Sequence, residues 1–184
     1  THAHNEEHSA KGIINLLEEG NDVASVSDAG TPGISDPGSR LVESVRSSGF
    51  DVVPIPGASA FTALVSVAGY IGRSVHFEGF LSPKSGRRMK RLEELLQRDE
   101  SFVFYESPFR VVRVLEELSA LDPSRRVVVG REMTKKFEEF LTGSVEEVLG
   151  ILKGRQAVKG EFTLLVAPKG VGASDDYDQE TEEP

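Results

Sequence analysis

The alternation of apolar and polar positions predicts helices and strands that follow one another along the chain. In the first part, apolar residues spaced three and four apart predict helices, and short apolar runs predict buried strands. Asn5 and Asp36 can cap the first two helices, because their side-chain oxygens can accept hydrogen bonds from free amides. The expected elements are helices over residues 5–20, 37–49 and 58–68 and strands over residues 22–27 and 50–55.

The same alternation continues in the second part of the chain. Helices are expected after the basic segment 84–91, at the Ser107-Pro108 pair, and at a capping box formed by Ser144 and Glu147. Strands separated by helices predict an α/β fold in which the strands pair mainly in parallel. The expected strands cover residues 76–80, 101–106, 126–130, 136–141 and 161–167.

We expect two small α/β domains followed by a tail. The first domain covers residues 1–73, the second covers residues 74–170, and the acidic stretch 171–184 has the composition of a disordered tail. Six carboxylates lie in this tail, so the formal charge of −9 falls to about −3 for the rest of the chain. The overall charge therefore gives no support for nucleic-acid binding, although it leaves room for a local basic patch.

The composition also excludes several kinds of site. The chain has no cysteine, which rules out disulfides and cysteine-ligated zinc and suits a reducing cytoplasm. No apolar run approaches the roughly 18 residues of a membrane span, and the polar N-terminus is not a signal peptide, so we expect a cytoplasmic protein without membrane contact. His2, His4 and His8 match no metal-site spacing, so no metal is expected.

Three unusual turns follow predicted strands. They are SDAGTPGISDPG at 27–38, the segment 54–60, and the segment 105–108. Because ligands bind beyond the carboxyl ends of strands in open α/β sheets, these turns predict a small-molecule pocket built mostly from backbone atoms. The alternative is three ordinary strand-to-helix turns. Neither a G-x-G-x-x-G nor a phosphate-binding G-x-x-x-x-G-K-[ST] motif is present, so a dinucleotide or nucleoside-triphosphate site has no support.

Five segments in order carry a resemblance to a known family. The segments SDAGTPGISDPG, VVPIPGASA, FYESPFR, REMTKKFEEF and KGEFTLLV resemble the ribosomal RNA small-subunit methyltransferase I family of the tetrapyrrole-methylase superfamily. The resemblance covers about residues 5–167. It implies S-adenosylmethionine-dependent 2'-O-methylation of a cytidine ribose in 16S ribosomal RNA of the small ribosomal subunit. It also implies two α/β domains with the cofactor in the cleft between them, and a homodimer.

The resemblance implies cofactor contacts from several turns. Thr31 stands where the wider superfamily often has aspartate, so any role of that carboxylate does not transfer. Tyr105 is expected to face the cofactor from the end of a central strand. The remaining expected cofactor residues are Gly30, Pro32, Ile34, Ser59, Ala60, Glu132, Met133, Gly160 and Glu161.

Two further sets of residues are candidates for the reaction itself. Glu106 is the candidate general base because it combines a strand end with a carboxylate, and the alternative is an ion pair with Arg110. Basic clusters are candidates for RNA phosphate contacts, and the alternative is an ordinary solvated helix face. The expected RNA-binding residues are Lys84, Arg87, Arg88, Arg110 and Lys135.

The chain departs from the family pattern at both ends. Family members begin with a strand and a loop resembling TPIGNL before the segment that matches His4-Asn5-Glu6, and they carry a C-terminal helical extension. We therefore expect a truncated chain with an incomplete cofactor site. The alternatives to an RNA methyltransferase are a superfamily member that methylates a tetrapyrrole or another small acceptor, and a non-catalytic binding or scaffold module.

Overall fold

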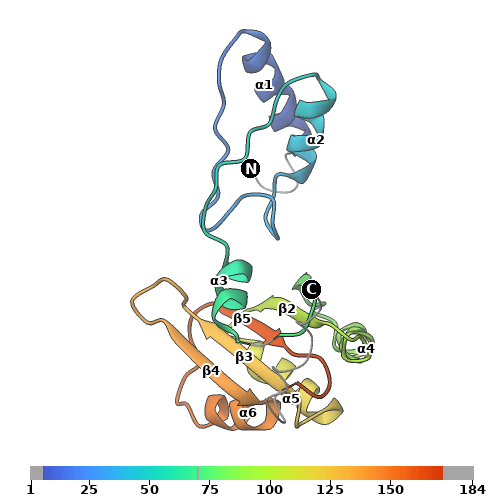
Figure 1. The fold of residues 1–184 in the computed structure, drawn as a ribbon. Helices are drawn as coiled ribbons and strands as arrows, with labels where there is room; N and C mark the ends of the chain where they lie inside the picture. The colour runs from blue at the N-terminus through green and yellow to red at the C-terminus, as the bar shows by residue number, and fades with distance from the viewer. Residues whose placement is uncertain (1–5, 70, 172–184) are drawn as a thin grey trace, which may run out of the picture. The chain divides into compact units, whose positions relative to one another are not determined.

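The computed structural model describes residues 6–69 and 71–171, which form two compact units (Figure 1). The first unit ends at Ser59 and the second begins at Ala60. This division differs from the expected boundary after residue 73, because helix α3 (Ala60–Val67) packs against the sheet of the second unit. The expected cap Asn5, His2, His4 and the acidic tail from residue 172 lie outside the described residues.

The first unit contains two helices that pack against each other. They are α1 (Glu6–Glu18) and α2 (Ser39–Ser47). Ala10, Leu41 and Val45 form the buried centre of this unit, with Ile13, Ile14, Leu17, Phe50 and Val52 packed around them. Helix α2 begins after Gly38 and has no side-chain cap, so the expected capping role of Asp36 is wrong.

The two strands expected in the first unit are not strands in the structure. Residues 22–27 and 50–55 have no regular secondary structure, and neither segment pairs with a strand among the described residues. A strand needs a hydrogen-bonded neighbour, and apolar residues alone do not supply one. Consequently Val26 is 86% exposed and Ile55 is 80% exposed, although their pattern predicted burial.

The second unit is built on a five-stranded sheet in the order β1-β2-β5-β3-β4. Its strands are β1 (Val75–Phe80), β2 (Ser101–Glu106), β3 (Arg126–Arg131), β4 (Glu139–Ser144) and β5 (Phe162–Val166). Every strand predicted in this part of the chain exists, and β2 has the predicted bounds. The basic segment 84–91 lies mostly within helix α4 (Ser85–Leu96), not in a loop.

The pairing in this sheet is mostly antiparallel, so the expectation of mainly parallel pairing is wrong. Only β1 and β2 pair in parallel. Strand β5 runs antiparallel between β2 and β3, and β4 returns antiparallel to β3 after the short loop 132–138. The loop is too short for a crossover helix, and parallel neighbours need such a crossover.

Different helices pack on the two faces of the sheet (Figure 1). Helices α4, α5 (Val111–Leu121) and α6 (Val145–Lys153) cover one face and enclose the main core with Phe102, Phe104 and Phe162. The predicted capping box of Ser144 and Glu147 starts α6. The single short helix α3 packs on the other face through Leu64, which contacts a cluster of Val103, Val128 and Leu165.

Removing the Leu64 side chain should uncouple α3 from the sheet. Leu64 is fully buried, so Leu64→Ala should lower the free energy of unfolding by about 2–5 kcal/mol in urea denaturation. The matched control is Val67→Ala, because Val67 is on the same helix but exposed, and it should change stability by less than about 0.5 kcal/mol. Equal losses from both substitutions would contradict this account of the interface.

Candidate functional site

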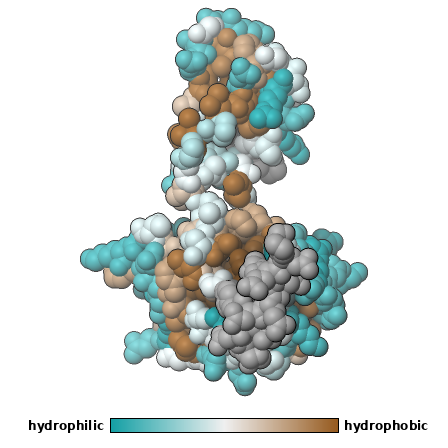
Figure 2. All heavy atoms as spheres, in the orientation of Figure 1, coloured by the Kyte–Doolittle hydropathy of each residue, from teal (hydrophilic) through white to brown (hydrophobic). Residues whose placement is uncertain are grey.

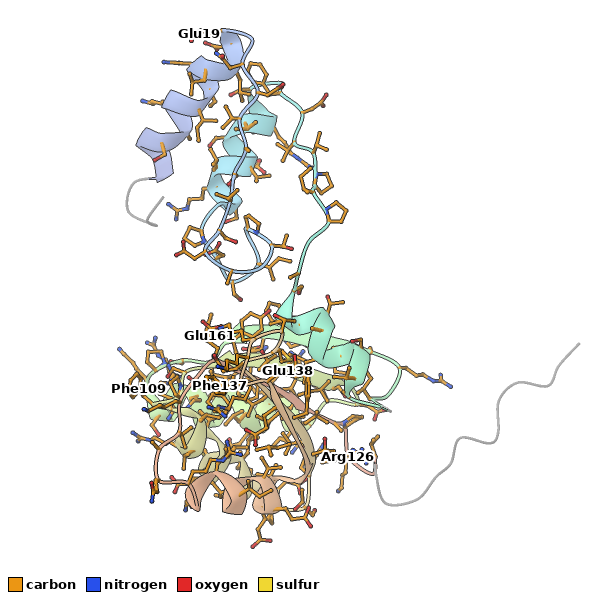
Figure 3. All side chains as sticks on the ribbon, turned by 90° about the vertical axis from the view of Figure 1, so that its left-hand side faces the viewer. Glu19, Phe109, Arg126, Phe137, Glu138 and Glu161 are labelled. Carbon is orange, nitrogen blue, oxygen red and sulfur yellow. The ribbon has the colours of Figure 1, made fainter. Side chains whose placement is uncertain are left out.

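The turns of the second unit meet at one edge of its sheet. In the strand register, Glu106 at the end of β2 and Arg131 at the end of β3 both lie opposite Phe162, and Phe80 at the end of β1 lies opposite Tyr105. The turns 81–84, 107–110, 132–138 and 159–161 therefore share this edge, which we call the site edge. Figure 3 labels four residues along it, namely Phe109, Phe137, Glu138 and Glu161.

Two of these turns are held together by a hydrogen-bonded group that we call the clasp, made of Glu132, Lys135 and Glu161. The amide of Glu161 donates to Oε1 of Glu132 at 2.8 Å, and the amide of Glu132 donates to the carbonyl oxygen of Glu161 at 3.0 Å. Nζ of Lys135 donates to Oε2 of Glu161 at 2.8 Å. The donated amide of Glu161 is the main reason that the pKa of Glu132 is lowered. The clasp therefore occupies Lys135, which was expected to contact RNA.

Gly160 is required by the clasp. Its φ angle is 100°, in the region that favours glycine, and a Cβ atom there would lie 2.5 Å from Cγ of Glu132. Glu132, Gly160 and Glu161, which the sequence placed on separate turns, are thus neighbours in space. Their contacts with one another fix the backbone shape of the site edge.

The loop after β3 combines core packing with backbone strain. Met133 packs against the α3 face of the sheet, where a Cβ atom on Gly130 would lie 2.5 Å from its sulfur. Thr134 has a φ angle of 65°, which a β-branched residue seldom adopts, and its amide donates to Oε2 of Glu138. Met133 therefore packs the loop 132–138 against the sheet, and the positive φ angle of Thr134 sets the turn of the loop.

Tyr105 connects the sheet to the start of helix α3. Its ring packs edge-on against Phe77 and Phe80, with centroid distances of 5.1 and 5.6 Å. Its hydroxyl oxygen accepts a hydrogen bond of 3.2 Å from the amide of Phe61. That amide is one of the free N–H groups at the N-terminus of α3. Tyr105 thus fixes the beginning of the helix that follows the segment 54–59.

Glu106 forms the ion pair that was the alternative to a catalytic role. Its Oε2 lies 3.0 Å from Nη2 of Arg110, and its Oε1 accepts a hydrogen bond of 2.8 Å from the amide of Ser107. The side chain is only 1% exposed, and this burial raises the pKa of Glu106 despite the nearby guanidinium. The carboxylate is thus enclosed and ion-paired, and its role as general base stays a prediction.

Arg88 is buried and does not fit the expected RNA contact. Its residue exposure is 2%, and its guanidinium forms two hydrogen bonds of 2.6 Å with Glu117 on α5. Its Nη1 also donates to the carbonyl oxygens of Ser82 and Pro83. Arg110 likewise donates to the carbonyl oxygen of Leu81 at 2.9 Å. Both arginines hold the turn 81–84 in place from the inside.

The remaining basic residues of this region face solvent. Lys84 and Arg87 are exposed and form no ion pair with another described residue. Arg113, one turn into α5, is 66% exposed and reaches Glu117 only at 3.8 Å. These three side chains are available to a ligand, whereas Arg88 is not.

Two turns of the first unit also meet. Oγ1 of Thr31 donates to the carbonyl oxygen of Ala58 at 3.1 Å, and a Cβ atom on Gly30 would lie 3.4 Å from the same oxygen. Within the loop, Oγ of Ser27 donates to the carbonyl oxygen of Gly30 at 2.7 Å. The expected contact residues Gly30 and Thr31 therefore lie beside the segment that contains Ser59, as the pocket hypothesis requires of this unit.

The rest of this loop presents backbone and apolar groups. Pro32 is half-buried and Ile34 is exposed. The amides of Gly33, Ser35 and Asp36 donate no hydrogen bond to the part of the chain that the structure describes. Main-chain donors and an apolar side chain are thus free to contact a small molecule. Ala60, also expected to bind the cofactor, begins α3 and is exposed on the second unit.

Sequence reasoning missed Phe109, which lies on the site edge, and Glu117, which supports that edge from α5. Glu117 anchors Arg88 and Ser85, and its only sequence signal was a carboxylate on the inner side of α5. Phe109 is 95% exposed, and its signal was an aromatic residue in an otherwise polar turn directly after Ser107-Pro108. Among residues 6–69 and 71–171, no three acidic or histidine side chains are placed to hold a metal ion, and no helix is long and apolar enough to cross a membrane.

A shallow hollow of about 250 Å³ lies at the opposite edge of the second unit. It is bounded by the ends of α4 and α5 and by Arg125 and Lys169. Arg125 is buried there and is satisfied by Asp122 and by the carbonyl oxygens of Leu96 and Ala167. The hollow holds none of the expected site residues, so it has no part in the site edge.

The raised pKa of Glu106 gives a pH-dependent prediction. A carboxyl group whose pKa is higher in the folded than in the unfolded protein stabilises the folded state below its unfolded pKa of about 4.3. That stabilisation is lost as the pH rises through the folded pKa. Glu106→Gln removes this titration. The free energy of unfolding of the variant, relative to that of the unaltered protein, should therefore increase from about pH 4 to pH 7 in urea denaturation. Glu116→Gln, on the surface of α5, is the control and should show a smaller change. A relative stability that decreases with pH would mean that the Arg110 pair outweighs burial.

Comparison with known proteins places this geometry in a family. The profile of the Tetrapyrrole (Corrin/Porphyrin) Methylases matches residues 1–149. "Ribosomal RNA small subunit methyltransferase I" of Borrelia garinii is 44% identical over 84% of the chain and 70% of that protein. The protein of the same name from Neisseria meningitidis serogroup B is 44% identical over 90% of the chain and 57% of that protein, and the one from Bacillus subtilis is 41% identical over 90% and 56%. The chain thus spans between 56% and 70% of the length of these relatives.

Solved structures agree on the fold. The methyltransferase CobJ matches with a TM-score of 0.65 at 22% identity, covering 87% of this chain and 70% of CobJ. The cobalt precorrin-4 methyltransferase CbiF matches with a TM-score of 0.65 at 16% identity, covering 91% of this chain and 72% of CbiF. At these identities the similarity shows the fold alone. The sequence profile and the relatives together show that the chain belongs to the tetrapyrrole methylase family.

Proposed function

We propose that this chain carries out S-adenosylmethionine-dependent methylation of small-subunit ribosomal RNA, at the 2'-oxygen of a cytidine in 16S RNA. The proposal rests on one structural observation together with the membership of the chain in the tetrapyrrole methylase family. The loop 27–38 meets the segment 57–59 through a hydrogen bond from the Thr31 hydroxyl to the main-chain oxygen of Ala58, and the chain is 44% identical to two proteins named as ribosomal RNA small-subunit methyltransferases. A backbone-lined turn of this kind suits a small ligand with both polar and apolar parts.

The first unit has the groups that S-adenosylmethionine needs. The free amides of Gly33, Ser35 and Asp36 suit the carboxylate or ring nitrogens of the ligand, and the exposed Ile34 suits its apolar surface. Thr31 and Gly30 keep the loop against Ala58, so these amides are held in place before the ligand arrives. Holding the binding groups in advance lowers the entropy cost of binding.

The residues of the site edge would orient the acceptor. Bound S-adenosylmethionine would supply a methyl group on a sulfonium, which an aligned ribose oxygen can attack. Lys84, Arg87 and Arg113 carry solvent-exposed charges that suit phosphate groups. The ion pairs of Arg88 and Arg110 hold the turn 81–84 in a fixed shape. The main contribution of these two arginines is therefore to align the bound RNA with the cofactor.

The resemblance extends the proposal to the assembly. We propose a homodimer that acts in the cytoplasm on the small ribosomal subunit. A tetrapyrrole or other small acceptor is the competing substrate, and a non-catalytic binding module is the competing role. The exposed cationic residues of the second unit suit the phosphates of RNA.

Methyl transfer to ribosomal subunits distinguishes these functions. The 184-residue chain is incubated with isotopically labelled S-adenosylmethionine and, in separate reactions, with a tetrapyrrole or with small subunits from a strain that lacks the modification. The Neisseria relative is the positive control. Label in the ribose of a 16S cytidine supports the proposal. Label in a tetrapyrrole acceptor alone, or binding of RNA without transfer while the relative is active, would support the competing substrate or the competing role.

Loosening the loop of the first unit should weaken cofactor binding. Thr31→Val keeps the shape of the side chain but removes its hydrogen bond to Ala58. Losing about 0.5–1.5 kcal/mol should raise the Kd for S-adenosylmethionine by about 2- to 12-fold in calorimetric titration. Ser66→Ala is the control, because the Ser66 hydroxyl bonds only within its own helix turn and its loss should leave the Kd unchanged. An unchanged Kd for Thr31→Val would remove this loop from the cofactor site.

A further inference from the structure

Phe109 is a large apolar side chain exposed on a rigid support. It is 95% exposed, yet its turn is pinned on both sides. The amide of Ser107 donates to Glu106, and the amides of Arg110 and Val111 donate to the carbonyl oxygen of Ser107 at 3.1 and 3.0 Å. The ring therefore stands in solvent at a fixed place, and Figure 3 shows it at the rim of the second unit.

The surroundings of Phe109 are cationic. Arg110 donates to the carbonyl oxygens of Leu81 and Ser82, so the turn of Phe109 lies directly beside the turn that carries Lys84. Oγ of Ser85 donates to Oε1 of Glu117, which places the start of α4, and with it Arg87, beside the middle of α5.

The nearby carboxylates do not cancel this charge. Glu106 and Glu117 are both turned inward and paired with Arg110 and Arg88. The exposed charged side chains beside Phe109 are those of Lys84, Arg87 and Arg113, which are basic, and that of Glu161, which is paired with Lys135. We call Phe109, Lys84, Arg87 and Arg113 the aromatic–basic patch.

An exposed aromatic ring flanked by cations suits single-stranded nucleic acid. Bases stack on aromatic side chains, and each such contact is worth about 1–3 kcal/mol, while basic side chains follow the phosphates. A duplex keeps its bases stacked on one another and offers no free base to the ring. This difference separates stacking from simple charge attraction.

We propose that Phe109 stacks on an unpaired base of the RNA substrate while Lys84, Arg87 and Arg113 contact the adjoining phosphates. This inference rests on the proposed RNA substrate and adds the place on the chain where the strand is held. It assigns Phe109 to substrate binding and not to the chemical step.

The test compares single-stranded and duplex RNA of one sequence, each carrying a fluorescent label, by anisotropy with the 184-residue chain. Phe109→Ala should raise the Kd for the single strand by about 5- to 150-fold and the Kd for the duplex by less than about twofold. Phe109→Trp should restore single-strand binding. Ile151→Ala, an exposed apolar residue on α6, is the matched control and should change neither Kd. Arg87→Ala should weaken the binding of both RNAs. It should also reduce the slope of log affinity against log salt concentration by the amount of about one phosphate contact.

The outcomes separate this inference from the proposed function. Normal methyl transfer and normal single-strand affinity in Phe109→Ala would overturn the stacking contact and leave the methyltransferase proposal standing. Equal losses for single strand and duplex would also overturn stacking. If the unaltered chain neither binds RNA nor transfers methyl groups to subunits, both proposals fail, and an exposed Phe109 would then fit a protein partner instead.

Discussion

The two-sided pairing of β5 is the constraint on which the second unit depends. This last strand is inserted between β2 and β3 and hydrogen-bonds to both, so one residue, Phe162, faces Glu106 on one side and Arg131 on the other. All five residues of β5 are buried. Without this strand, β2 and β3 would have no common neighbour, and the turns that follow them would not share an edge. The positions of the clasp and of Phe109 both follow from this register.

Charged residues in this unit divide into internal supports and surface groups. Arg88 and Arg110 lie in basic runs that look alike in sequence, but each donates to main-chain carbonyls and meets a carboxylate inside the protein. Breaking a buried pair by removing one partner is strongly destabilising, because the other charge is left unpaired. Lys84 and Arg87 have no such partner among the described residues and face water. Burial, and not residue type, therefore determines which arginine can meet a substrate.

Much of the second unit could be predicted from its sequence, because its signals are local. The apolar run of β2 and the capping box of Ser144 and Glu147 depend on neighbouring residues alone. The pairing direction could not be predicted, since it depends on where β5, the last strand along the chain, lies in the sheet. In the first unit, the residues 22–27 and 50–55 carry a strand pattern but have no partner strand among the described residues, so pattern and structure disagree. The motifs predicted cofactor contacts at Gly30, Thr31, Gly160 and Glu161, and these roles stay predictions, although the structure brings Gly30 and Thr31 beside Ala58 and joins Gly160 and Glu161 to the clasp. Phe109 was missed because an aromatic residue after Ser107-Pro108 does not by itself show that its ring is exposed.

The left-handed backbone at Thr134 has a consequence for engineering the protein. A β-branched residue at a φ angle of 65° stores conformational energy of about 1–3 kcal/mol that its neighbours must offset. Asparagine tolerates this region far better, so the tip of the loop is a place where thermal tolerance can be gained without touching the core. A stabilised variant would offer a sturdier starting point for growing crystals with RNA bound.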